Sequence, residues 1–354
     1  MVSGFWAKIK KPILGLAPMD GVTDASFRFM AAKYGKPDVM FTEFVSVEGI
    51  CSGADVLLDD FIYSDTERPI VAQVFGVDVE AFCKVAPLLC ELGFDGIDIN
   101  MGCPDKNVAK RGGGAALIRD PELAKKIILK TKQGVKDWSD GKNLEEFELP
   151  ESVLKKFGDL VSKKQLGSRT SKLERKIVPV SIKTRIGYDK VVVGEWVKHL
   201  LEVEPANISI HGRTLKQMYT GSADWDAIKR AAEIIKRTDT TVLGNGDVKS
   251  LEDGRKRIEE YGVDGVLVGR AMFGNPWFFS GKEPSVKEKL EVALEHAKYF
   301  EDNFQEKKFY NIKKHLAWYA HGFDNAKELR IELMKAENSK DCEKIITDFV
   351  GKFS

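Results

Sequence analysis

The chain has 354 residues and an apolar fraction of 43%, enough for one large domain and a smaller one. Its 55 lysines and arginines nearly balance 54 aspartates and glutamates, so overall charge gives no affinity for nucleic acid, and any such surface must be a local patch. No apolar run reaches the roughly 18 residues that span a bilayer, and the amino terminus lacks a signal-peptide core, so we expect a cytoplasmic protein without membrane contact.

Short β-rich runs alternate with amphipathic stretches through about the first 275 residues. We predict strands at 13–17, 39–42, 70–74, 96–100, 178–183, 207–210, 241–244 and 265–268. Helical patterns between them include 79–92, 121–132, 195–202, 224–237 and 251–261. Eight such units predict an α/β fold, a (β/α)8 TIM barrel, with a doubly wound open sheet as the alternative.

Unusual residues fall at or just past the carboxyl ends of the predicted strands. They are Ala17-Pro18-Met19, Gln73, Asn100 with Cys103, Lys183 with Arg185, His211, Asn245-Gly246-Asp247 and Gly269-Arg270. In a barrel these ends converge on one face, where active sites are built, whereas an open sheet spreads them along an edge. Their placement therefore favours the barrel.

One connection, 133–177, is too long for an ordinary barrel loop, and its second half is basic. We expect a polar insertion that is solvated and mobile, with a short helix within 144–164, and a nucleic-acid-contacting arm is the alternative. After Pro284 the pattern becomes purely helical, at 286–304, 311–321 and 325–336. The sequence thus predicts a barrel domain over 1–280 and an all-helical domain over 285–354.

The chain has five cysteines, an odd number without a close pair, which predicts neither a disulfide framework nor a metal site. Four of them are expected to be small buried side chains. Cys103 differs, because it follows a strand in the segment Asn100-Met101-Gly102-Cys103-Pro104 and should be reachable by a ligand. A thiol there can act as a nucleophile or as an acid, and the sequence leaves both roles open.

Glycine-bearing loops follow the last two predicted strands, at Asn245-Gly246-Asp247 and at Gly269-Arg270. Barrels commonly bind a phosphate at this place through backbone amides, and an arginine can add a charged contact. We therefore expect a phosphate-bearing cofactor across the mouth of the barrel.

Two cations, Lys183 and Arg185, lie on the same side of the strand predicted at 178–183 and its extension, because strand side chains alternate. Their burial is costly unless they meet an anion or an electron-rich ring. His211, at the end of the next strand, is a further candidate ligand.

Eight motifs, in order along the chain, together resemble the tRNA-dihydrouridine synthase family. They are residues 17–24 (APMDGVTD), 73–76 (QVFG), 100–104 (NMGCP), 114–117 (GAAL), 182–185 (IKTR), 211–214 (HGRT), 244–247 (GNGD) and 268–277 (VGRAMFGNPW). The segment 314–319 (KHLAWY) resembles the family's helical tRNA-binding domain. The resemblance implies a flavoenzyme that carries FMN, is reloaded by NADPH and reduces a uridine in tRNA.

The resemblance also implies a role for each site residue. Hydride would reach C6 of the uracil, and Cys103 would protonate C5 as the general acid, while Asn100 and Arg185 would contact the base. Cofactor contacts would come from Ala17, Pro18 and Met19 along the ring, Gln73 at its edge, Lys183 near N1 and O2, and His211, Asn245, Gly246, Asp247, Gly269 and Arg270 on the ribityl chain and phosphate. The expected partners are tRNA and NAD(P)H, and we expect a monomer.

Two other functions are open at this point. One is an FMN barrel that oxidises or reduces a free pyrimidine, as dihydroorotate dehydrogenases do, which needs no helical domain. The other is an RNA-binding protein that has lost catalysis, although Cys103, Lys183 and Arg270 argue against it. For RNA contact we favour a lysine cluster at residues 307, 308, 313 and 314, with a merely solvated helix face as the alternative.

Overall fold

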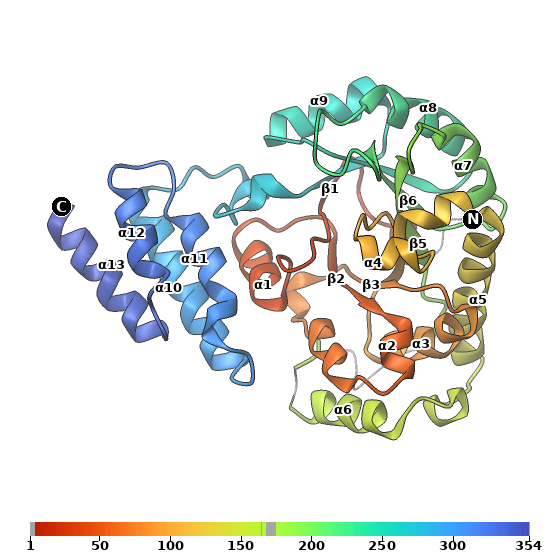
Figure 1. Ribbon diagram of the computed structural model, residues 1–354, viewed down its shortest axis with the longest axis horizontal. Helices are drawn as coiled ribbons and strands as arrows, with labels where there is room; N and C mark the ends of the chain where they lie inside the picture. Colours follow the sequence, from red (N-terminus) through yellow and green to blue (C-terminus); the bar gives the residue numbers. More distant parts are fainter. Residues whose placement is uncertain (1–3, 164, 168–174, 354) are drawn as a thin grey trace. The chain divides into compact units, whose positions relative to one another are not determined.

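The computed structural model describes residues 4–163, 165–167 and 175–353 (Figure 1). The chain divides into two compact units, Met1–Ala25 with Pro37–Gly269, and Ser26–Lys36 with Arg270–Ser354. The units thus part at Gly269, earlier than the division predicted at 280–285. An early helix, α1 (Ala25–Tyr34), belongs almost entirely to the second unit.

The first unit is built on eight parallel strands. They are β1 (Ile13–Leu16), β2 (Met40–Ser46), β3 (Ile70–Phe75), β4 (Gly96–Met101), β5 (Val180–Gly187), β6 (Asn207–Thr214), β7 (Thr241–Asn245) and β8 (Gly265–Val268). Their hydrogen-bonded order is β1-β8-β7-β6-β5-β4-β3-β2. The N–H of Leu16 donates to the carbonyl of Val39 over 2.9 Å, beside a parallel bridge from Gly15 to Val39, which joins β1 to the start of β2. The sheet therefore closes, and the predicted TIM barrel is confirmed over the open sheet.

Helices follow the strands, and the longer ones surround them on the outside (Figure 1). They are α2 (Val47–Cys51), α3 (Val79–Glu91), α4 (Lys106–Lys110), α5 (Pro121–Ser139), α6 (Glu151–Ser162), α7 (Val193–Leu201), α8 (Trp225–Ile235) and α9 (Leu251–Tyr261). Several begin at a capping side chain: Asp78 caps α3, Asp120 caps α5 and Asp224 caps α8. Such caps satisfy backbone N–H groups that the first helical turn leaves unpaired.

Strands β5 and β6 extend beyond the predicted ends, to Gly187 and Thr214. Arg185 and His211 consequently lie within strands rather than just past them, and Lys183 lies inside β5 rather than at its end. The prediction stopped early because these strands carry polar side chains at alternate positions, whereas it relied on continuous apolar runs.

The described part of the 133–177 insertion is packed, which corrects the expectation of a solvated, mobile segment. Helix α5 continues to Ser139, a 3-10 turn covers Leu144–Phe147, and α6 is the short helix that was expected. Val153 and Leu160 of α6 are buried, as are Leu144, Phe147 and Leu149. Lys156 forms an ion pair of 2.7 Å with Asp59. Of the basic stretch, residues 164 and 168–174 lie outside the described residues.

The second unit is helical. Besides α1 it contains α10 (Val286–Asn303), α11 (Lys313–Tyr319), α12 (Ala326–Leu333) and α13 (Ser339–Phe353). Stacked rings hold it together: Phe29 on Tyr299 with centroids 3.9 Å apart, and Phe273 on Trp318 at 4.1 Å. The first of these pairs explains why α1 joins this unit. Neither α1 nor α13 was among the predicted elements. Across the described residues, no helix combines the length and apolarity that a membrane span requires.

Candidate active site

Cys103 sits in a turn directly after β4 and is held by its neighbours' backbones. The side-chain oxygen of Asn100 accepts hydrogen bonds from the N–H of Gly102 at 2.9 Å and of Cys103 at 2.8 Å. The N–H of Ala115 donates to the carbonyl of Cys103 over 3.2 Å. Gly114 has φ +56°, and a Cβ there would stand 2.8 Å from the same carbonyl oxygen. The turn thus requires glycine at 114 and holds the thiol in one place.

The environment of the Cys103 thiol keeps it protonated. The residue is only 7% exposed, and burial raises the pKa of the thiol above its ordinary value. A backbone N–H from Asp105, 3.5 Å from the sulfur, and the charge of Arg185 oppose this rise in pKa without cancelling it. A protonated thiol is a proton donor rather than a nucleophile, so the geometry favours the acid role of the two that the sequence left open.

A buried carboxylate lies beneath this turn. Asp98, two residues before Asn100 on β4, has no exposed surface. It accepts hydrogen bonds from Ser181 Oγ at 2.7 Å and from Gln73 Nε2 at 2.7 Å. Burial raises the pKa of Asp98 to about 6, against the effect of these two donors and of the Lys183 charge. Gln73 is itself fully buried, and its Oε1 accepts from Asn100 Nδ2 at 3.0 Å.

Lys183 on β5 is a half-buried ammonium that feels the charges of Asp98 and Arg185 without a direct partner in the described part of the chain. Burial and, to a smaller degree, the neighbouring charge of Arg185 lower the pKa of Lys183 to about 8, against the opposing effect of Asp98 and Cys103. Among the described residues it makes no hydrogen bond and no ion pair. Such a cation is stabilised by an anionic ligand that approaches it, which fits the electron-rich end of a reduced flavin.

Arg185 is buried at 3% exposure, and backbone carbonyls already hold most of it. Its Nε donates to Gly102 over 2.6 Å, and its Nη1 donates to Thr214 over 3.1 Å and to Met218 over 3.3 Å. Burial lowers the pKa of Arg185 to about 10, which still leaves it charged at neutral pH. Only Nη2 has no hydrogen bond within the described part of the chain. Arg185 therefore braces the Cys103 turn and has one nitrogen left for a ligand.

The loop after β7 has an unusual backbone at two consecutive residues. Gly246 and Asp247 both have positive φ, at 127° and 54°, and a Cβ on Gly246 would lie 2.7 Å from Ala223. The Asp247 carboxylate accepts from both terminal nitrogens of Arg213, at 3.0 and 2.7 Å, and from the N–H of Ala223. That carboxylate is thus committed within the protein, so a ligand at this loop would meet the backbone of Asp247 rather than its side chain.

The remaining predicted cofactor residues fall in three places. Gly269, after β8, lies against β1's carboxyl end, because a Cβ on it would be 3.2 Å from the Met19 sulfur and 4.0 Å from Ala17. Pro18 lies between these two, partly exposed. Asn245 and His211 are in register on β7 and β6. Arg270 is the first residue of a 3-10 turn in the second unit, whereas the other cofactor residues belong to the first unit.

Sequence reasoning missed Asp98, Ser181 and Arg213. Asp98 had a signal, because alternation places it on the same side of β4 as Asn100. Ser181 likewise shares a side of β5 with Lys183. The pairing of Arg213 with Asp247 joins residues 34 apart in the chain and left no trace in local sequence.

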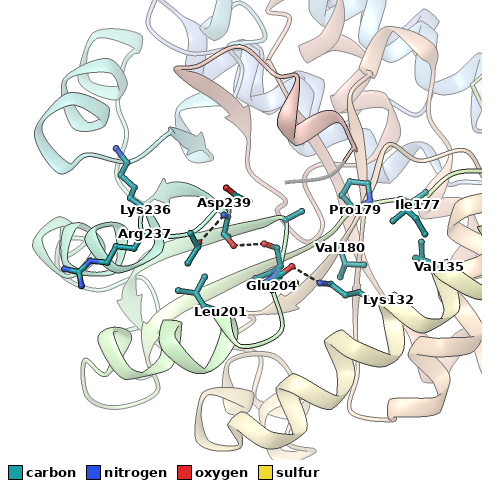
Figure 2. A pocket seen from close by; sticks show the side chains of 15 residues that line it. Lys132, Val135, Ile177, Pro179, Val180, Leu201, Glu204, Lys236, Arg237 and Asp239 are labelled. Atoms are coloured by element: carbon teal, nitrogen blue, oxygen red, sulfur yellow. Dashed lines mark hydrogen bonds between the residues drawn. The ribbon is translucent and has the colours of Figure 1, made fainter. Parts of the chain in front are cut away.

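A groove of about 830 Å³ lies elsewhere on the barrel (Figure 2). Pro179, Ala206 and Thr240 line it and directly precede β5, β6 and β7, so it is at the amino end of the strands. Two lysines, Lys132 and Lys236, line it, and Lys132 donates to the carbonyls of Val203 at 2.8 Å and Glu204 at 2.7 Å. No predicted site residue lines this groove.

Comparison with known proteins identifies the family. The chain matches the family described as dihydrouridine synthase (Dus) over residues 15–138 and 163–352, which leaves out much of the packed insertion. A Bacillus subtilis (strain 168) protein named "Probable tRNA-dihydrouridine synthase 2" is 33% identical over 362 residues, covering 100% of this chain and 98% of that protein. A Staphylococcus epidermidis (strain ATCC 35984) protein named "Probable tRNA-dihydrouridine synthase" is 34% identical, covering 99% and 98%.

One solved structure, an old yellow enzyme from Trypanosoma cruzi, matches with 11% identity and a TM-score of 0.44, covering 78% of this chain and 91% of that one. The family assignment rests on the sequence matches, which extend over nearly the whole length of both chains. This chain belongs to the dihydrouridine synthase family, a family of flavin-dependent oxidoreductases.

Proposed function

We propose that this protein is a tRNA-dihydrouridine synthase: it reduces a uridine of tRNA to 5,6-dihydrouridine, using FMN that NADPH reloads. The family and the full-length relatives support this over a dehydrogenase of a free pyrimidine. The observation that carries the proposal is a buried Cys103 thiol, held by Asn100 in the turn after β4, at the same end of the barrel as a Lys183 ammonium without a direct partner among the described residues. Those are the proton donor and the cation that the reaction needs.

The residues at the mouth fit a flavin mononucleotide. Lys183 would face the N1 and O2 end of the ring, with Ala17, Pro18 and Met19 along its face. A Cβ on Gly246 would meet Ala223 at 2.7 Å, and one on Gly269 would meet the Met19 sulfur at 3.2 Å, so both positions expose bare backbone, which suits a close approach by the ribityl chain and phosphate. His211, Asn245, the backbone of Asp247 and Arg270 would complete that contact. We assign Gln73 to the ring edge through its one remaining Nε2 hydrogen, which requires the side chains around it to shift.

The chain's own residues position the base and supply one proton. FMN held at this place would supply the hydride that C6 of the uracil receives. Asn100 directs one amide N–H and Arg185 directs its Nη2 toward the base, and both are donors that match uracil carbonyl oxygens. Cys103 gives its proton to C5, which completes the saturated 5,6 bond and leaves a thiolate. Water then reprotonates that thiolate.

The target base must leave its stack to reach the barrel, at a cost of a few kcal/mol. We assign the tRNA contact to the second unit, at the lysines of residues 307, 308, 313 and 314, in the cytoplasm and with the protein as a monomer. The buried His315 and Tyr319 and the stacked Trp318 give that surface an aromatic core. Replacing Lys313 and Lys314 with alanine should lower the salt dependence of tRNA binding by about one unit per lost phosphate contact. Lys287 and Lys289 on α10 provide the matched control pair.

The proposal is tested by incubating the purified yellow protein with NADPH and tRNA that lacks dihydrouridine. Nucleoside mass spectrometry should find uridines that have gained two hydrogens, and none without NADPH. Orotate, dihydroorotate and free uridine serve as competing substrates. Turnover of any of these in preference to tRNA, or a protein that stays colourless with added FMN, would refute the proposed function.

A further inference from the structure

A chain of hydrogen bonds connects the buried Asp98 carboxylate to the backbone of Cys103. Asp98 accepts from Gln73 Nε2 at 2.7 Å, and Gln73 Oε1 accepts from Asn100 Nδ2 at 3.0 Å. Asn100 Oδ1 in turn accepts from the N–H of Cys103 at 2.8 Å. Asp98 and Gln73 have no exposed surface, and Asn100 is 6% exposed, so water cannot substitute for these partners.

The direction of every bond in this chain is determined. A carboxylate only accepts, so the Gln73 amide must turn its nitrogen toward Asp98 and its oxygen toward Asn100. Asn100 must then give its nitrogen to Gln73 and its oxygen to the backbone N–H groups of Gly102 and Cys103. If Asp98 is lost, the Gln73 nitrogen has no acceptor, and nothing at that end prevents the amide from rotating.

We propose that Asp98 is a positioning residue for catalysis, acting through Gln73 and Asn100 to hold Cys103 where its proton can reach the uracil. The expected effect on the rate of uridine reduction rests on the proposed function, whereas the expected effect on the reactivity of the Cys103 thiol does not. Asp98 touches neither base nor flavin, and it is not among the residues that the family resemblance assigned. Its function is to fix two amides whose wrong orientation would move the thiol.

The hydrogen bond from Ser181 allows a control. Ser181 Oγ donates to the other oxygen of Asp98 and also lies 3.2 Å from the carbonyl of Ile97, so it is outside the path to Cys103. Ser181→Ala removes one partner of the carboxylate and leaves the path intact. Asp98→Asn retains an oxygen that can accept from Gln73, while its nitrogen can donate to Ser181 Oγ. Asp98→Ala removes the acceptor altogether.

Single-turnover oxidation of the NADPH-reduced enzyme by tRNA tests the proposal. Asp98→Ala should slow it about tenfold or more, since small misplacements of a reacting group are costly. The rate of flavin reduction by NADPH, measured on enzyme loaded with FMN, should be retained. Asp98→Asn should restore most of the rate, and Ser181→Ala should leave it unchanged. In a Cys103→Ala background, Asp98→Ala should have no further effect, because both substitutions remove the same proton delivery.

A second measurement is independent of the reaction. Iodoacetamide labelling with peptide mass spectrometry gives the alkylation rate of Cys103, with the half-buried Cys51 and Cys83 as internal standards. Asp98→Ala should change the Cys103 rate relative to these standards, and Ser181→Ala should not. An unchanged Cys103 rate, equal losses in both half-reactions, or additive effects in the Cys103→Ala background would each overturn the proposal. If wild-type protein forms no dihydrouridine, the proposed function fails, and the alkylation result still decides the role of Asp98. Should Asp98→Ala not fold, Gln73→Leu breaks the same path and is judged by alkylation alone.

Discussion

The two ends of the barrel hold similar kinds of residue and use them differently. At the amino end, a groove of about 830 Å³ contains Lys132, whose ammonium is tied to two backbone carbonyls. At the carboxyl end, Lys183 has no such partner among the described residues, and beside it lie a buried acid and a protonated thiol. The ammonium of Lys132 is therefore bound within the protein, while the ammonium of Lys183 is available to a ligand. A half-buried cation without a direct hydrogen-bond or ion-pair partner, rather than the size of a hollow, therefore locates the active site.

The largest difference between the ends should appear at cysteine. Cys103→Ala should slow uridine reduction about 10²–10⁴-fold, because the general acid is gone, and should spare reduction of the flavin by NADPH. Cys83→Ala is the matched control, since that half-buried thiol is on α3 outside the barrel interior. Stopped-flow absorbance separates the two half-reactions. An unchanged rate of uridine reduction would mean that another group or water protonates C5.

The sequence predicted the end of the barrel that matters but not how its residues are connected. Continuous apolar runs such as β8 are reliable, because both faces of a parallel strand are buried, and β8 was predicted to the residue. Polar side chains that point into the barrel interrupt the apolar run from Lys183 in β5 and from His211 in β6, so the carboxyl ends of both strands were predicted too early. The bond between Gln73 and Asp98 joins residues 25 apart, and such contacts exist only after the strands are paired. Helix α1 was missed because its burial depends on partners near residue 299.

The buried acid at the mouth should cost the fold stability at neutral pH. The pKa of Asp98 is raised from 3.8 to about 6, so between these values the folded protein binds a proton that the unfolded chain has released. The stability linked to this proton is present below pH 4 and is lost as pH rises to about 6. Asparagine does not titrate, so Asp98→Asn does not lose this stability as the pH rises. From pH 4 to pH 7 the unfolding free energy of Asp98→Asn should therefore rise relative to that of wild type by an amount on the order of 3 kcal/mol.

Urea unfolding of both proteins across that pH range measures the difference. Ser181→Ala, which leaves the carboxylate in place, should follow the wild-type pH dependence. A pH-independent gap between Asp98→Asn and wild type would show that the carboxylate ionises as easily in the folded barrel as in the unfolded chain. The carboxyl end of the barrel would then contain no buried acid that lowers the free energy of unfolding, and the contrast with the amino end would be weaker.

The Lys183 ammonium itself should govern cofactor affinity. Lys183→Met keeps the length of the side chain and removes its charge, so the dissociation constant for FMN should rise roughly tenfold to hundredfold, the usual loss for a charge-assisted contact. Burying the Lys183 charge costs free energy, as its lowered pKa indicates, and methionine removes that cost. The protein without FMN should therefore be no less stable than wild type. Fluorescence titration of the deflavinated protein with FMN measures the affinity. Equal affinity for the two proteins would place the flavin away from β5.

The corresponding substitution at the amino end, Lys132→Met, should have the smallest effect on function and the opposite effect on stability. Burial lowers the pKa of Lys132, yet its ammonium is stabilised by the carbonyl oxygens of Val203 and Glu204. Methionine fills the same space but leaves both carbonyls without a donor, which should cost about 1–3 kcal/mol of unfolding free energy. FMN affinity and both half-reactions should be unchanged, because the groove is at the other end of the strands. Urea unfolding and the same FMN titration compare the two lysine variants directly. A loss of flavin with Lys132→Met would mean that the two ends are coupled, and that the carboxyl end alone does not define the site.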